Sequence, residues 1–285
     1  MITPDDYNGT IPIAWCPGCG NFGVLKALIN TLVELNIDPQ QLLFVSGIGQ
    51  GPKLPHYTRG NVFNGLHGRT LPVATGAKLA NHKLTVIGID GDGGAYGEGV
   101  GHLLASMRRN SDITYIVTNN QVYGLTKGQA SPTSDAGYIS RTTPLGAGQP
   151  LNPILLALAS DASFIARGFA GDIEHLSNVI KAGITHNGFS LIDILQPCVS
   201  FNRKNTFQWY KERVYKLEDE SNYDHRNKQQ ALIKADEWGD RIPLGILFKK
   251  ERPVYEAQIP ALKETPLVKQ EINPEKLEAL IDEFI

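Results

Sequence analysis

Apolar positions along the chain fall into two repeating patterns. Short apolar runs that end in glycine or polar residues predict buried strands with their following loops, at 42–49, 83–94, 113–124 and 189–198. Around them, apolar residues recur every three or four positions and predict helices at 21–37, 70–82, 99–110, 153–168 and 173–187. The strand runs are apolar on both faces, which is typical of strands that helices cover on both sides. The sequence therefore predicts an α/β fold, a mostly parallel sheet with helices on both faces.

The pattern changes at about residue 201. Residues 202–240 are charged and have helical spacing, residues 242–260 are extended and interrupted by prolines, and residues 274–285 predict a short amphipathic helix. We therefore expect an α/β domain at 1–200, followed by a helical and extended C-terminal arm at 201–285. Two placements stay open for this arm: on a partner subunit, or folded back on its own domain.

Composition narrows the choice of partners. The 285 residues carry a formal net charge of −2, so the chain lacks the basic field of a nucleic-acid-binding protein. The first residues are polar and acidic, unlike a signal peptide, and no apolar run is long enough to span a bilayer. We therefore expect a cytoplasmic protein that binds neither nucleic acid nor membrane. The chain has only three cysteines, and a small, odd number argues against a secreted disulfide framework.

Glycines gather at the ends of the predicted strands, where α/β proteins bind their ligands. The segment GDGG (91–94) ends one strand, and the asparagine pair at 119–120 ends the next, with a helix between them. In such a βαβ unit the two strand ends lie close together, so Asp92 and Asn120 can offer oxygen ligands to one Mg²⁺ ion. The backbone N–H groups of Gly93 and Gly94 can face a diphosphate. The spacing of the two motifs therefore predicts a magnesium–diphosphate site.

The cysteine pair in AWCPGCGNFG (14–23) is open to four interpretations from the residues alone. A thioredoxin-like dithiol needs a preceding strand, whereas the residues before Trp15 are polar and interrupted by proline. A zinc site needs four ligands, which Cys16, Cys19, Cys198 and a histidine can supply. The other interpretations are two structural thiols, or thiolate ligands of an iron–sulfur cluster.

A series of motifs narrows these interpretations. WCPGCGNFG, VSGIGQG, LHGR, TGAKLA, IGIDGDGG, RRN, NNQVYGLTKGQ and QPC follow one another in this order. Together they resemble the β subunit of the 2-oxoacid:ferredoxin oxidoreductases, from about Trp15 to Cys198 and more loosely through PLGILFKKERPVYE. The resemblance implies the thiamine-diphosphate-binding fold, in particular the domain that holds the cofactor's diphosphate. It also implies that another domain supplies the glutamate for the cofactor's aminopyrimidine ring, so this chain is half of an active site.

The resemblance assigns individual residues to the cofactors and the substrate. It implies that Asp92, Asn120 and the backbone carbonyl of Val122 hold Mg²⁺, and that His67 donates to a diphosphate oxygen. The remaining cofactor contacts come from two loops and the GDGG turn: Ile48, Gly49, Gln50, Gly51, Gly93, Gly94, Gly124, Leu125 and Thr126. Lys53 and Lys127 are the candidate catalytic residues, the first for a substrate carboxylate and the second for phosphate or substrate.

One cluster ligand of the family is missing from this chain. The resemblance implies that Cys16, Cys19 and Cys198 hold a [4Fe–4S] cluster, but the family's remaining cysteine falls on Gln50. An amide oxygen is a poor ligand for cluster iron. Three outcomes follow: a four-iron cluster with another fourth ligand, such as His56, water or a partner residue; a three-iron cluster; or no cluster. We expect an iron–sulfur cluster, of the [4Fe–4S] type.

The resemblance implies a reaction: CoA-dependent oxidative decarboxylation of a 2-oxoacid, such as pyruvate or 2-oxoglutarate, to an acyl-CoA, with electrons passed to ferredoxin. The chain is then active only with an α subunit, in a heterodimer or a dimer of heterodimers. Two rivals are half of a non-oxidative thiamine-diphosphate-dependent decarboxylase, which needs no cysteines, and a zinc-stabilised, non-catalytic assembly subunit, which needs neither Asp92 nor Asn120. The cysteines and the intact motif favour the oxidoreductase.

Overall fold

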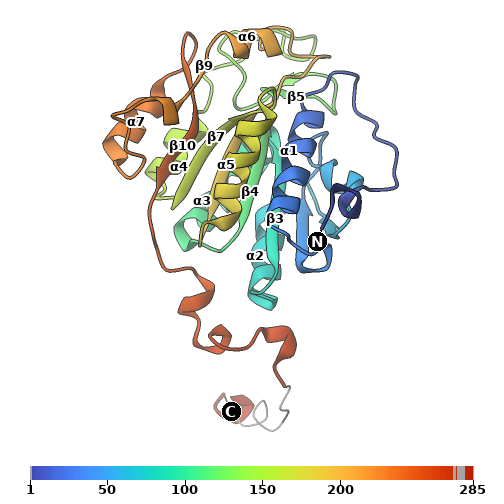
Figure 1. The fold of residues 1–285 in the computed structure, drawn as a ribbon, viewed down its shortest axis with the longest axis vertical. Coiled ribbons are helices and arrows are strands. Elements are labelled where there is room, and N and C mark those ends of the chain that lie inside the picture. The colour runs from blue at the N-terminus through green and yellow to red at the C-terminus, as the bar shows by residue number, and fades with distance from the viewer. Residues whose placement is uncertain (1, 272–273, 275–279, 285) are drawn as a thin grey trace.

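An eight-stranded sheet forms the centre of the molecule (Figure 1). The computed structural model describes residues 2–271, 274 and 280–284. The strand order is β2-β1-β3-β4-β8-β7-β10-β9, and every neighbouring pair is parallel except β7 and β10. The strands are β1 Leu42–Ser46, β2 Asn61–Asn64, β3 Thr85–Gly91, β4 Thr114–Asn119, β7 Phe164–Phe169, β8 Ser190–Leu195, β9 Val214–Lys216 and β10 Ile242–Lys249. The predicted α/β class with a mostly parallel sheet is confirmed.

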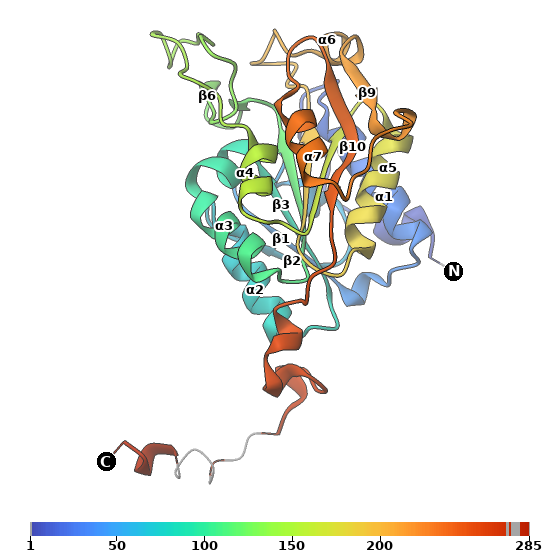
Figure 2. The same cartoon turned by 90° about the vertical axis from the view of Figure 1, so that its left-hand side faces the viewer.

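Helices cover both faces of this sheet (Figure 2). One face carries α1 Asn21–Glu34 and α5 Ile173–Thr185; the other carries α2 Thr70–Ala80, α3 Val100–Arg109, α4 Pro153–Ala159 and α7 Lys228–Asp236. A short helix, α6 Phe207–Lys211, lies near the two-stranded ribbon of β5 Val122–Tyr123 and β6 Gln129–Ala130, at the end of the molecule where the functional loops gather (Figure 1).

The apolar stripe that predicted α1 is the stripe that packs on the sheet. Val24, Leu28 and Leu32 recur every four residues and are fully buried against apolar side chains of the central strands. Burying a side chain of this size stabilises the fold by about 1.5–3 kcal/mol. The small residues of α2, including Ala74, let that helix approach the other face of the sheet closely.

The predicted helix at 153–168 is wrong in its second half. The helix α4 ends at Ala159, and Asp161 takes a left-handed conformation with φ of 63°. Residues Phe164–Phe169 then form β7, which is buried on both faces. Apolar spacing does not separate a short buried strand from a buried helix, and here tertiary pairing with β8 decided the outcome. The edge strand β2, which is exposed, was also not predicted.

The segment after residue 201 folds back on its own domain through β10. This strand pairs in antiparallel fashion with β7, and β9 adds to it as the edge of the sheet. Two placements were left open for the C-terminal segment. As far as β10, the segment packs on its own domain. The predicted helix at 274–285 lies largely outside the described residues.

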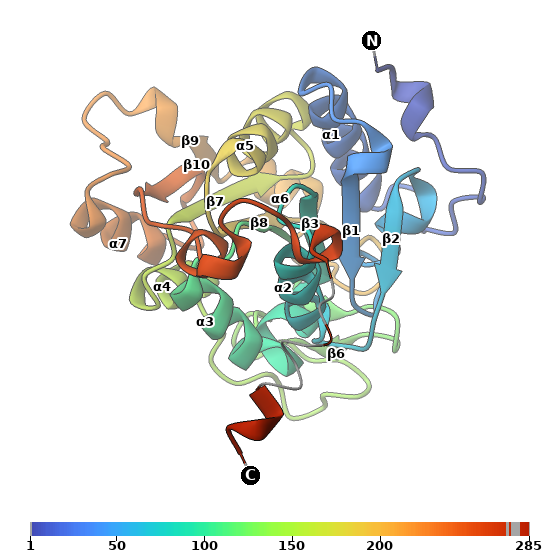
Figure 3. The same ribbon diagram turned by 90° about the horizontal axis from the view of Figure 1, so that it is seen from below.

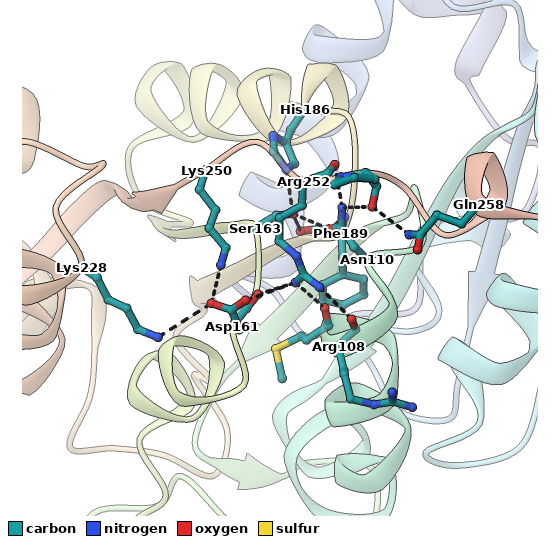
Figure 4. Close-up of polar contacts among 12 residues, drawn as sticks. Arg108, Asn110, Asp161, Ser163, His186, Phe189, Lys228, Lys250, Arg252 and Gln258 are labelled. Atoms are coloured by element: carbon teal, nitrogen blue, oxygen red, sulfur yellow. Dashed lines mark hydrogen bonds and ion pairs between the residues drawn. The ribbon is translucent and has the colours of Figure 1, made fainter.

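Beyond β10 the chain is held to the domain by Arg252 (Figure 4). Its guanidinium donates hydrogen bonds to the backbone carbonyls of Met107, Arg108 and Asp161, at 3.2, 2.8 and 2.6 Å. Asn110, which ends α3 with a φ of 62°, donates in turn to the carbonyl of Arg252. From there the chain runs along the end of the domain opposite α6 and β5 (Figures 1 and 3). No helix in the described part of the chain is long and apolar enough to cross a membrane.

Candidate active site

The loops that follow four neighbouring strands meet at one edge of the sheet. The strands β1, β3, β4 and β8 are adjacent and parallel, so their carboxyl ends point the same way. This edge is where open α/β sheets bind ligands. Two hollows lie side by side here. We name the first for the diphosphate that the sequence predicts and the second for its cysteines.

The first, the diphosphate hollow, lies over the ends of β1, β3 and β4. It is lined by Ile48, Gly49, Gln50, Gly51, Pro52, His67, Gly91, Asp92, Gly93, Gly94, Thr118, Asn120, Val122, Tyr123, Gly124, Leu125 and Thr126. The structure thus brings together every residue that the sequence assigned to the cofactor and to magnesium. The two candidate lysines lie elsewhere: Lys53 is half-buried beside the hollow's first loop, and Lys127 is exposed, with a φ of 84°.

Asp92 is the most deeply buried acidic group of this hollow, with 1% of its surface exposed. Oδ2 of its carboxylate accepts hydrogen bonds from the hydroxyls of Ser131, at 2.5 Å, and Thr133, at 2.7 Å. Burial raises the pKa of Asp92 to about 6, and these hydrogen bonds oppose that shift. Ser131 and Thr133 were not predicted as site residues. The feature of the sequence that could have indicated them is the hydroxyl-rich segment SPTS (131–134).

Asn120 is held by the turn that follows β4. Its Oδ1 accepts a hydrogen bond of 3.0 Å from the backbone N–H of Val122, and its Nδ2 donates to Oε1 of Gln196. Between them Gln121 has a φ of 60°, which allows the tight turn. This turn brings the amide oxygen of Asn120 and the backbone of Val122 together beside the diphosphate hollow.

Two glycines of the GDGG turn, Gly93 and Gly94, are required by close contacts. A Cβ at Gly93 would lie 2.1 Å from Cε1 of Tyr123, and a Cβ at Gly94 would lie 2.1 Å from Oδ1 of Asp90. Both distances are far below van der Waals contact, so only glycine lets the backbone pass here. The backbone then winds into a π-helical segment, Gly93–Glu98, which leads into α3.

His67 faces an acidic side chain at the rim of the diphosphate hollow. Its Nδ1 lies 3.1 Å from Oε2 of Glu98, an ion-pair distance without the alignment of a hydrogen bond. Glu98 also accepts a hydrogen bond of 3.2 Å from the hydroxyl of Tyr123. Glu98 and Tyr123 were not predicted as site residues, because nothing in the spacing of the sequence links them to His67.

The second hollow, the cysteine hollow, adjoins the first. Its lining includes Ala14, Trp15, Cys16, Cys19, Asn21, Gln50, Asn120, Gly124, Gln196, Cys198, Val199, Ser200 and Phe201. The three cysteines, which are far apart in the sequence, thus surround one space. Gln50, Asn120 and Gly124 line both hollows, so they form the wall between them.

The thiols of the cysteine hollow are held by weak polar contacts. The hydroxyl of Ser200 donates to Sγ of Cys16 at 3.1 Å, and the amide of Gln196 donates to Sγ of Cys19 at 3.6 Å. Burial raises the pKa of the Cys19 thiol to about 11, so this thiol is protonated near neutral pH. All three thiols are free of disulfides.

Two buried amides of the cysteine hollow lack partners. Asn21 is fully buried, and neither its Nδ2 nor its Oδ1 has a hydrogen-bond partner within the described residues; the same holds for Oε1 of Gln50. Leaving such atoms unpaired costs about 1–3 kcal/mol each, so they fit a site that binds a further group. Within the described ranges, however, no three His, Cys, Asp or Glu side chains converge closely enough to hold a metal ion.

Comparison with protein families matches most of the chain. The family described as "Thiamine pyrophosphate enzyme, C-terminal TPP binding domain" matches residues 48–194, which include GDGG and the asparagine pair. A second family, which describes the C-terminal part of the pyruvate ferredoxin oxidoreductase β chain, matches residues 198–264. The fold and the diphosphate hollow therefore define a thiamine-diphosphate-binding subunit.

Individual relatives identify the family more narrowly. A 2-oxoacid:ferredoxin oxidoreductase subunit beta of Saccharolobus solfataricus is 46% identical over 86% of this chain and 85% of the relative. Another, from a Sulfolobus species, is 44% identical over 95% of both chains. The solved 2-oxoglutarate:ferredoxin oxidoreductase from Magnetococcus marinus, with 2-oxoglutarate, coenzyme A and succinyl-CoA bound, superposes with a TM-score of 0.91 at 34% identity, covering 98% of this chain and 96% of that one. The chain belongs to the β-subunit family of the 2-oxoacid:ferredoxin oxidoreductases.

Proposed function

We propose that this chain, with an α subunit, catalyses CoA-dependent oxidative decarboxylation of a 2-oxoacid. The 2-oxoacid and CoA give an acyl-CoA and CO₂, and the two electrons released pass to ferredoxin or a similar carrier. The observation that carries the proposal is the shared wall of Gln50, Asn120 and Gly124 between the diphosphate hollow and the cysteine hollow. Because three residues line both hollows, a cofactor in one and an iron–sulfur cluster in the other would be neighbours, which suits electron transfer.

The diphosphate hollow is the proposed site of magnesium and thiamine diphosphate. Asp92, Asn120 and the carbonyl of Val122 supply hard oxygen ligands for Mg²⁺, which suits their chemistry. The chemistry that thiamine diphosphate supplies is addition to the keto carbon and storage of the electron pair left when CO₂ departs. The residues of this chain bind and orient the diphosphate: the backbone of Gly93 and Gly94 approaches it, and His67 donates to it.

The two lysines have separate proposed roles. Lys53 follows the first loop of the diphosphate hollow and is placed to pair with the substrate carboxylate. Lys127 follows Thr126 in the second loop, where its exposed ammonium group can meet phosphate or a substrate that enters from solvent. Neither lysine lines the diphosphate hollow itself. Both proposed roles therefore concern charged groups of the substrate or phosphate outside the hollow.

The cysteine hollow is the proposed site of an iron–sulfur cluster, which supplies one-electron transfer. Cys16, Cys19 and Cys198 provide three thiolates, and Gln50 faces the same space with a buried, unpaired amide oxygen. A hollow whose buried amides lack partners supports a bound group better than two structural thiols do. Because only three thiolates are present, one corner of the cluster lacks a strong ligand.

The remaining half of the active site belongs to the α subunit. The described part of this chain has one α/β sheet and no second cofactor-binding domain. The glutamate for the aminopyrimidine ring and most of the substrate pocket therefore come from the partner, in a heterodimer or a dimer of heterodimers. The proposed electron acceptor is ferredoxin, and the proposed location of the complex is the cytoplasm, where such carriers operate.

The test uses the complex of this chain with its α subunit, purified without oxygen. We expect 2-oxoacid to reduce ferredoxin only when CoA is present, and Asp92→Ala to lower this rate by at least about 100-fold through lost Mg²⁺ and cofactor binding. The matched control is Asp240→Ala, which changes an exposed aspartate outside both hollows. Decarboxylation to an aldehyde without carrier reduction would contradict the proposal and favour the non-oxidative enzyme.

A further inference from the structure

A third cavity, of about 230 Å³, lies apart from both hollows. It opens between the sheet and the helices α4 and α7, and its polar wall is formed by Arg167 on β7 and Asp193 on β8. Asn119 and Thr133 also line it, and they separate it from Asp92 and the diphosphate hollow. Nothing in the proposed reaction uses this cavity.

Arg167 is a buried cation with few partners. Only 2% of its surface is exposed. Its Nε lies 3.5 Å from Oδ2 of Asp193, at the limit of a hydrogen bond, and its Nη1 is buried with no partner among the residues that the structure describes. A guanidinium has five N–H donors in a planar fork, and buried donors of this kind are nearly always paired.

Asp193, in contrast, has several partners besides Arg167. Its Oδ1 accepts a hydrogen bond of 2.9 Å from the hydroxyl of Tyr96 and one of 3.1 Å from Nδ2 of Asn119. Oδ1 of the carboxylate is therefore satisfied by two neutral donors, and Oδ2 engages only Nε of Arg167, at 3.5 Å. The imbalance leaves donors of Arg167 free for an acceptor that enters the cavity.

The other walls indicate what such an acceptor is attached to. Leu151, Leu155 and Pro150 supply apolar surface, and the indole ring of Trp238 lies with its centre 5.6 Å from the guanidinium carbon of Arg167. Two carboxylates, Asp193 inside and Asp236 at the exposed mouth, would repel a second negative charge on the ligand.

We propose that this cavity binds a small organic monocarboxylate, with its carboxylate on the free donors of Arg167 and its apolar body against Leu151 and Trp238. Guanidinium and carboxylate match in geometry as well as in charge. The ligand is a free small molecule, and its site is distinct from the cofactor site because Thr133 and Asn119 lie between the two.

The test measures binding of benzoate by calorimetry to the complex of this chain with its α subunit. The uncharged analogue benzyl alcohol and the dicarboxylate phthalate test the need for a single charge, and both are expected to bind at least tenfold more weakly. Leu151→Trp fills the cavity while leaving Arg167 and Asp193 in the sequence, and it is expected to weaken benzoate binding at least tenfold. Leu232→Trp, on the exposed side of α7, is the control and should bind benzoate like the wild type.

Arg167→Lys provides a second variant that keeps the positive charge but removes the planar fork, and it is also expected to bind benzoate at least tenfold more weakly. The proposal is overturned if the wild-type complex gives no heat with millimolar benzoate. Equal binding of benzoate and benzyl alcohol would overturn it as well, and so would unchanged binding by Leu151→Trp.

Discussion

The hydroxyl of Thr133 lies 2.7 Å from Oδ2 of Asp92, and this contact joins a loop after β6 to the aspartate that directly follows β3. The same hydroxyl lies 2.9 Å from Oδ1 of Asn119, the first residue of the asparagine pair. Thr133 therefore connects Asp92 of the GDGG segment to Asn119 of the asparagine pair. A hydroxyl has one proton, so Thr133 shares it between these two acceptors.

Replacing Thr133 by valine is expected to weaken Mg²⁺ binding about tenfold or more. Asp92 then loses one of the two hydroxyls that orient its carboxylate and stabilise its charge, while the side chain keeps its volume. The measurement is the Mg²⁺ dependence of thiamine diphosphate binding to the complex. Thr185→Val, at an exposed position of α5 outside the hollows, is the control; equal Mg²⁺ affinity in both variants would show that Thr133 does not support Asp92.

Alanine at Gly94 is expected to destabilise the fold by more than about 2 kcal/mol. Its methyl group would meet Oδ1 of Asp90 at 2.1 Å, and both groups are buried. Alanine at Gly101 in α3 is the matched control. Apart from its chain neighbours and its own helix backbone, no described heavy atom lies within 4 Å of that methyl position, so the variant is expected to gain up to about 1 kcal/mol.

Chemical denaturation measures both glycine variants. Unfolding midpoints that move in the same direction for Gly94→Ala and Gly101→Ala would contradict the role assigned to the close contact at Gly94.

The stability of the chain is expected to fall between pH 4 and pH 7 because of Asp90. Burial raises its pKa from 3.8 to about 7, although Thr70 and Tyr115 donate hydrogen bonds to it. In that window the folded state keeps a proton that the unfolded state has lost, so each pH unit costs the folded state roughly 1.4 kcal/mol. Asp90→Asn removes this titration while keeping the shape of the side chain.

The measurement is the free energy of unfolding of wild type and Asp90→Asn at pH 5 and pH 7, without Mg²⁺. Relative to the variant, the wild type is expected to lose roughly 2 to 3 kcal/mol over this interval. If the free energies of unfolding of the two proteins change equally between pH 5 and pH 7, the pKa of Asp90 is not raised by folding.

Cysteine at position 50 is expected to change the iron content of the complex. The wild type offers three thiolates, so its expected [4Fe–4S] cluster should lose the weakly held iron on oxidation and then show about three irons and the EPR signal of a three-iron cluster. Gln50→Cys adds a fourth thiolate and is expected to retain about four irons after the same oxidation. Gln40→Cys, at an exposed position outside the hollow, is the control for an added thiol. Four stable irons in the wild type would mean that another group holds the fourth corner.

Local patterning determined most of the fold and, within the diphosphate hollow, Asp92, Gly93, Gly94 and Asn120; the hollow's other predicted residues came from the resemblance to the family. Strands that are apolar on both faces require helices on both sides, and glycines after such strands predict the ligand edge, because these constraints act within a few residues of each position. The helices α1, α2, α3 and α5 and the strands β1, β3, β4 and β8 follow these rules.

Only the tertiary structure decided what depends on contacts distant in the sequence. It turned residues 164–169 into a strand because β8 and β10 offered backbone partners there, and it carried β10 back into the sheet. It set Ser131 and Thr133 on Asp92, placed Gln50 and Asn21 among three cysteines, and left the guanidinium of Arg167 short of partners. Burial and hydrogen-bond satisfaction are properties of the assembled core, so no window of the sequence contains them.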